Sequence, residues 1–180
     1  MDLSDIEAAA DRLQGHIRRT PMIRADLTRH ALDTDDLWLK LESLQVTGSF
    51  KARGATNRLL TLDPAQVRNG IIAASGGNHG LATARAGLIA GVPTTIYLPT
   101  NASPAKIKKL KDWGARVEIV GSVWDEAHAA AVEAAEASGA FYFHPFADAQ
   151  VVAGQGTVGL EILEDIRTAD VFVIASAAAA

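Results

Sequence analysis

Lys51 is the side chain in this sequence whose position is best explained by chemistry. It follows a polar, glycine-containing break, Thr47-Gly48-Ser49, and stands in the first turn of an expected helix. A cation there faces the positive end of the helix dipole, at a cost of about 0.3–1 kcal/mol. A lysine with an ordinary pKa of about 10.4 is almost fully protonated at pH 7, so a nucleophilic lysine needs burial or conversion to an imine. Taken alone, these residues also fit a solvated lysine at a helix start.

A second group of polar and glycine residues follows an apolar run and opens another expected helix: Ser75-Gly76-Gly77-Asn78-His79-Gly80. Paired glycines let the backbone approach a ligand closely, and free N–H groups at a helix start suit an anion. Asn78 adds an amide and His79 a titratable ring. A tight turn capped by Asn78 would explain part of this pattern, but the glycines and polar side chains together exceed what a turn requires.

A third glycine pattern has the spacing of a dinucleotide-binding fingerprint: Gly154-Gln155-Gly156-Thr157-Val158-Gly159. The expected strand before it ends near Phe143 rather than running into the first glycine, and no later strand ends in the acidic residue that a ribose contact needs. We therefore expect neither a nicotinamide nor a flavin. No histidine or carboxylate spacing typical of a metal site occurs, so no metal is expected.

The amino-acid composition excludes several kinds of site and several classes of protein. The chain has 180 residues, about one domain by length, a net charge of −4 and no cysteine. Disulfides, zinc-thiolate sites and iron–sulfur clusters are therefore excluded. There is no basic excess typical of binding to nucleic acid or an anionic membrane, and no apolar run that would form a signal peptide or a bilayer span. We expect a cytoplasmic protein with no nucleic-acid or membrane partner.

Alternating strand and helix patterns must position these groups. Helices are expected at 6–17, 50–60, 79–90, 104–113, 124–137 and 156–166, and strands at 37–41, 70–74, 94–98, 117–120, 141–143 and 171–174. This alternation predicts an α/β fold with an open, largely parallel sheet and flanking helices. Ligands bind such sheets beyond the carboxyl ends of the strands, which is where the turn at 75–80 is expected.

Three segments together resemble the threonine/serine dehydratases: 47–55, 75–80 and 153–161. That family consists of pyridoxal-phosphate enzymes with the tryptophan-synthase-β-like fold, known as fold type II, and its relatives include serine racemase. The resemblance runs from Arg19-Thr20-Pro21 to Val173, in the same order and with similar spacing. It is therefore specific to the family.

The resemblance implies a role for each matching residue. Lys51 would hold pyridoxal 5'-phosphate through a Schiff base and then take the Cα proton as general base. Phe50 would lie against the pyridine ring, and Asn78 would bond the phenolic oxygen. The substrate carboxylate would be held by Ser75, by the backbone of Gly76 and Gly77, and by His79. The reaction would be that of a lyase, a β-elimination that converts L-threonine or L-serine to a 2-keto acid and ammonia.

The same resemblance leaves two alternatives open. Serine racemases carry a second serine where this chain has Gly76, so racemisation is less expected than elimination. Residues 47–146 would form a smaller mobile domain, and residues 1–46 and 147–180 two pieces of a larger domain whose second half is missing. The chain ends in an atypical Ser-Ala tail, 176–180, where the family has a glycine-rich phosphate loop. A catalytically inactive truncated fragment or subunit therefore remains an alternative, and the full-length family is expected to form homodimers.

Overall fold

The computed structural model describes residues 1–25 and 36–174, and the Ser-Ala tail lies outside them. One half of the molecule is a four-stranded sheet with the order β5-β4-β3-β6. Its strands are β3 (Ile71–Ala74), β4 (Thr94–Leu98), β5 (Arg116–Ile119) and β6 (Phe141–Tyr142), and all three pairings are parallel. The α/β class and the parallel sheet predicted from the sequence are therefore confirmed.

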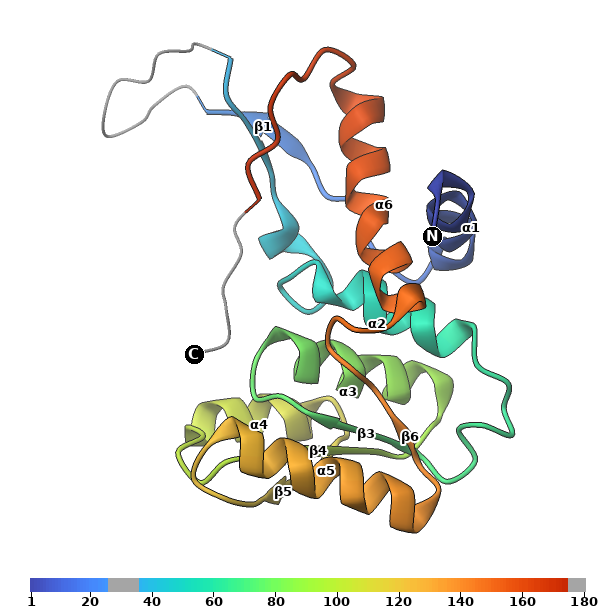
Figure 1. Cartoon of the computed structure of the whole chain (residues 1–180). Coiled ribbons are helices and arrows are strands. Elements are labelled where there is room, and N and C mark those ends of the chain that lie inside the picture. The colour runs from blue at the N-terminus through green and yellow to red at the C-terminus, as the bar shows by residue number, and fades with distance from the viewer. Residues whose placement is uncertain (26–35, 175–180) are drawn as a thin grey trace.

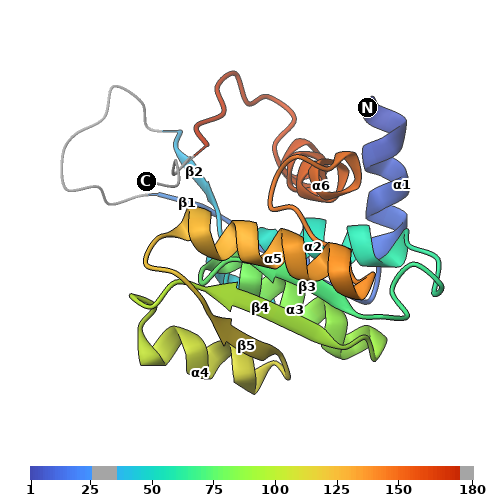
Figure 2. The same ribbon diagram turned by 60° about the horizontal axis from the view of Figure 1, so that its bottom comes forward.

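Helices cover both faces of this sheet. Helices α3 (Asn78–Ala90) and α4 (Pro104–Asp112) lie on one face and α5 (Trp124–Ser138) on the other (Figure 2). Strand residues alternate between the faces, so Ile71 and Ala73 join the core under α3 while Ile72 and Ala74 pack on α5. The sheet is thus buried on both sides, as parallel sheets usually are.

The other half of the molecule is mainly helical (Figure 1). Helix α2 (Lys51–Leu60) packs against both α3 and α6 (Ala149–Asp165), and α1 (Leu3–Leu13) lies against α6. A short antiparallel pair, β1 (Met22–Arg24) and β2 (Trp38–Lys40), leads into the 3-10 helix η1 (Glu42–Leu44). Since α2 contacts helices on both sides of the expected domain boundary at 146, the division into 1–46, 47–146 and 147–180 stays a prediction. None of the described helices is long and apolar enough to cross a membrane.

The third glycine pattern lies inside α6, which begins at Ala149 rather than at 156 as expected. Asp148 caps this helix by accepting bonds from the N–H groups of Gln150 and Val151. A Cβ on Gly154 would lie 2.7 Å from the Cα of Gly54 in α2, so glycine at this position lets the two helix backbones approach. The pattern is therefore a helix contact and not a dinucleotide loop.

The expected strand at 171–174 is wrong. These residues have no strand conformation, and Val171 and Val173 are 77% and 89% exposed. An apolar run forms a buried strand only where a neighbouring strand pairs with it, and none of the described strands pairs with residues 171–174. Strand β1 was not predicted, and α1 begins three residues earlier than expected, because Asp2 and Asp5 form a capping box at its start.

Candidate active site

Lys51 is the first residue of α2, as predicted, and its amine is partly withdrawn from water. Phe50 precedes it without forming a side-chain cap. The Lys51 Nζ donates a hydrogen bond to the Pro145 carbonyl at 3.1 Å and lies 5.3 Å from the centre of the Phe50 ring. Burial lowers the pKa of Lys51. A carbonyl offsets the loss of hydration less than a carboxylate would, so this environment favours the neutral, nucleophilic amine.

The turn at 75–77 joins β3 to α3 at the carboxyl edge of the sheet. The Gly77 N–H donates to the Ser75 hydroxyl at 3.3 Å, and no side chain caps the helix. The first N–H groups of α3 are therefore available to a ligand at the positive end of the helix dipole. A Cβ on Gly80 would lie 1.9 Å from the Ser75 carbonyl oxygen, so only glycine lets the chain fold back this tightly.

The His79 ring lies beneath this turn and is only 4% exposed. Its Nε2 is 3.1 Å from the Phe143 carbonyl, which can only accept, so Nε2 carries the proton. Burial lowers the pKa of His79 to about 4, and the nearby Lys51 and His144 act in the same direction. The ring is therefore neutral at pH 7 and supports the turn, while Asn78 and Gly77 are exposed to solvent.

The segment that follows β6 brings the two predicted groups together. His79 and Lys51 bond to the carbonyls of Phe143 and Pro145, two residues apart on this segment. Because β6 pairs with β3, the starts of α2 and α3 meet at the carboxyl edge of one strand pair. The His144 Nδ1 accepts the N–H of Phe146 at 3.3 Å and of Ala147 at 2.8 Å, which shapes the turn that carries Pro145.

The contribution of residues 143–147 to the site was not predicted from the sequence. The only signal was a histidine and a proline directly after a strand, which alone indicates a turn. At Gly76 the structure leaves little room on one side, since a Cβ would lie 3.1 Å from the Leu98 side chain and 3.9 Å from that of Lys106. Leu98 is fully buried, so a small side chain at position 76 fits only if the Leu98 side chain shifts by a few tenths of an ångström.

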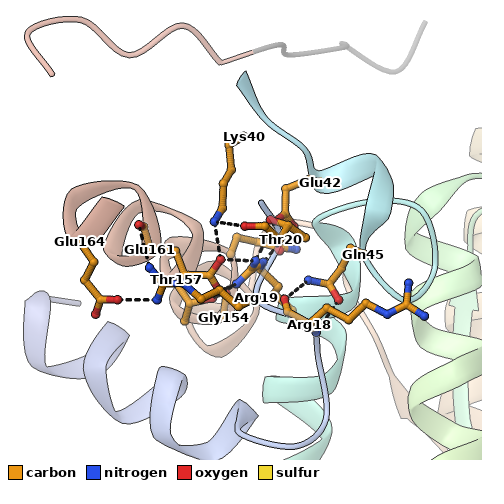
Figure 3. Close-up of polar contacts among 12 residues, drawn as sticks. Arg18, Arg19, Thr20, Lys40, Glu42, Gln45, Gly154, Thr157, Glu161 and Glu164 are labelled. Atoms are coloured by element: carbon orange, nitrogen blue, oxygen red, sulfur yellow. Dashed lines mark hydrogen bonds and ion pairs between the residues drawn. The ribbon is translucent and has the colours of Figure 1, made fainter. Parts of the chain in front are cut away.

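Figure 3 shows a cluster of charged side chains that includes Lys40, Glu42 and Glu161, which was not predicted from the sequence. Arg53, two residues after Lys51, is fully buried. It donates to Glu42 at 2.9 and 2.7 Å and to Glu161 at 2.6 and 3.0 Å. The Lys40 amine lies 2.6 Å from Glu161, and the Thr20 hydroxyl donates to Glu42 at 2.6 Å. Three segments distant in sequence, at Thr20, at Lys40 and Glu42, and at Glu161, therefore converge on the first turn of α2.

Comparison with known proteins places these residues in a family context. Residues 13–179 match the family model described as pyridoxal-phosphate dependent enzyme. An L-threonine ammonia-lyase of Thermotoga maritima is 41% identical over 172 residues, which cover 96% of this chain and 43% of that protein. A catabolic L-threonine dehydratase of Staphylococcus aureus is 40% identical over 174 residues, covering 97% of this chain and 50% of that protein.

Solved structures agree with these matches. A threonine deaminase from the organism abbreviated T.th. is 37% identical with a TM-score of 0.84, covering 96% of this chain and 54% of that one. Maize serine racemase is 31% identical with a TM-score of 0.85, covering 93% of this chain and 50% of that one. The chain thus spans about half the length of the relatives it matches.

Proposed function

The chain belongs to the family of pyridoxal-phosphate-dependent enzymes, and we propose on that premise that it carries the reactive lysine of an L-threonine or L-serine dehydratase. The proposed reaction is a β-elimination, in which the amino acid loses its Cα proton and its β-hydroxyl together as water. The enamine that is released then reacts with water and gives a 2-keto acid and ammonia. One observation carries the proposal. Lys51, the turn at 75–77 and the start of α3 meet at the carboxyl edge of β3 and β6.

The described residues at this edge fit pyridoxal phosphate. An amine must be neutral to bond an aldehyde. Burial lowers the pKa of Lys51, and the neutral carbonyl of Pro145 accepts its hydrogen bond. The Phe50 ring next to this amine provides an apolar surface for a flat aromatic group. When bound, the cofactor supplies an electron sink for a carbanion at the substrate Cα. The exposed Asn78 amide would bond its phenolic oxygen.

The residues of the chain would bind and orient the substrate and move its proton. The Ser75 hydroxyl and the N–H groups at the start of α3 would hold the substrate carboxylate, favoured there by the helix dipole. Holding that group fixes which Cα bond is broken, and Lys51 would take the proton from it as general base. Because the His79 ring lies beneath the turn, His79 would contribute its backbone N–H, while the ring keeps the turn in place.

Gly76 is the reason that we propose elimination and not racemisation. Racemisation needs a second group that delivers a proton to the face opposite Lys51. Gly76, at the position expected for that group, has no side chain that could donate. We further propose that the protein acts in the cytoplasm as a homodimer.

The test combines a spectrum with product analysis. Adding pyridoxal phosphate should produce a visible absorption band, and adding L-threonine or L-serine should release a 2-keto acid and ammonia. Lys51→Ala should lose both, whereas Lys108→Ala, at an exposed position on α4, should keep both. If neither band nor product forms, the enzymatic function is wrong for this chain, and the alternative of an inactive fragment stands. Formation of the D-amino acid instead would support a racemase.

A further inference from the structure

Arg53 holds the same helical turn as Lys51, from the opposite side. The α-helix advances by about 100° per residue, so side chains two residues apart point to roughly opposite faces. The Lys51 amine faces Pro145, while the Arg53 guanidinium is buried between η1 and α6. Its Nη1 also lies 3.2 Å from the Thr157 hydroxyl of α6. Any movement of the first turn of α2 would therefore change both sets of contacts.

Stability alone does not account for this cluster. Burying charges removes their hydration, which costs free energy. The attraction between buried charges often stabilises the fold no more than apolar side chains of similar volume would. A guanidinium that bonds two carboxylates does restrict how the three groups are oriented relative to one another, because its planar donors match each carboxylate in a single orientation. The charges of Arg53 and Lys40 balance those of Glu42 and Glu161, and Lys40 also lies 3.7 Å from Asp165.

The charges of the cluster are held firmly in the folded protein. Burial alone would lower the pKa of Arg53, but its bonds to Glu42 and Glu161 raise it above the ordinary value. Burial alone would raise the pKa of Glu161, but the bonds from Arg53 and Lys40 lower it. The cluster therefore keeps the same bonds around neutral pH, where Lys51 must act.

We propose that Arg53 is a positioning residue for Lys51. By fixing the rotation and the axial position of the first turn of α2 against η1 and α6, it keeps the Lys51 amine beside the Pro145 carbonyl and partly out of water. The inference rests on the proposed function, because it takes Lys51 as the reactive amine. The contacts on which this inference rests do not involve the cofactor, so the inference can be tested without adding the cofactor.

The test is the pH dependence with which Lys51 is acylated, measured by mass spectrometry against the exposed Lys111 in the same digest. The double variant Glu42→Gln/Arg53→Met removes one charge of each sign and leaves Glu161 paired with Lys40. Arg53→Lys keeps the charge but loses the planar donors. The control is Arg85→Met, which removes another buried arginine that bonds the His16 carbonyl and the Thr56 hydroxyl of α2.

In the double variant, acylation of Lys51 at neutral pH should be several-fold lower than in the original sequence. Its rise with pH should begin at a higher pH than in the original sequence. Arg53→Lys should shift the profile less in the same direction, and Arg85→Met should leave it in place. An unchanged Lys51 profile in the folded double variant would overturn the proposal, as would an equal shift in Arg85→Met. If the double variant does not fold by circular dichroism, Arg53→Lys is judged by the same criterion. A failure of the proposed function would appear differently, as a normal Lys51 profile without cofactor attachment.

Discussion

Burial has different consequences for Lys51 and His79, which lie in the same site. Burial lowers the pKa of both side chains and favours the neutral form of each. For Lys51 the neutral amine is the nucleophile, whereas for His79 the neutral ring fills the space below the turn and donates to Phe143. Both residues were predicted from the sequence because each stands in a short motif whose spacing is local. The position of the His79 ring was not, because it depends on a strand 64 residues away.

The buried His79 makes stability depend on pH. Its pKa is about 6.5 in the unfolded chain and about 4 in the folded protein, so below pH 6.5 the unfolded chain binds the extra proton first. The free energy of unfolding should therefore fall by about 3 kcal/mol from this group as the pH drops from neutral to about 4. Urea unfolding at a series of pH values measures it.

The control for this prediction is His79→Gln, whose amide can still donate to the Phe143 carbonyl but does not titrate. The difference in unfolding free energy between the two proteins should shrink or reverse toward acid, since only the histidine form loses stability there. An identical pH dependence in both proteins would show that the His79 ring is not held neutral.

Among the elements, those of the sheet half could be predicted and those that depend on distant partners could not. The strand at 94–98 has the predicted bounds, and α3, α4 and α5 agree within about two residues, because caps and periodicity specify them locally. The strand expected at 171–174 is absent, since an apolar run does not reveal whether a neighbour exists. The cluster around Arg53 was missed for the same reason, because its charges come from segments far apart in the sequence.

The close contact of α2 and α6 predicts opposite effects for two glycines of one helix. Gly154→Ala would place its Cβ 2.7 Å from the Gly54 Cα and 2.8 Å from the Arg53 carbonyl, both backbone atoms. We expect a loss of about 1–3 kcal/mol in unfolding free energy. At Gly159 an added Cβ meets nothing within 4 Å, so Gly159→Ala should stabilise by about 0.5–1 kcal/mol.

Chemical denaturation of the two variants tests this contrast directly. Equal losses in both would mean that glycine serves the same purpose at the two positions, against the helix contact described for Gly154. Stabilisation by Gly154→Ala would be incompatible with the observed separation of α2 and α6.

Across the whole molecule, the candidate site lies where the two halves meet. Helix α2 packs between α3 of the sheet half and α6 of the helical half, and it begins at Lys51 (Figure 1). The cluster around Arg53 fixes this start from the helical half, while Pro145 and the turn at 75–77 approach it from the sheet half. The geometry of the lysine therefore depends on both halves, which the sequence motifs alone did not show.

The exposure of the apolar run at 171–174 can be tested by mutation. Val173→Ser changes a side chain that is 89% exposed, so the unfolding free energy should stay within about 0.5 kcal/mol of its original value. Binding of a dye that fluoresces on apolar surfaces should decrease. A loss of several kcal/mol would instead indicate the buried strand that the sequence predicted.

The central claim is that Lys51 is the residue that bonds pyridoxal phosphate. The most direct measurement is to incubate the chain with pyridoxal phosphate, reduce the product with borohydride and locate the attached group by peptide mass spectrometry. The account predicts attachment at Lys51 well above that at the exposed lysines of α4, Lys106, Lys108, Lys109 and Lys111. Attachment spread evenly over these lysines, or none at Lys51, would contradict it.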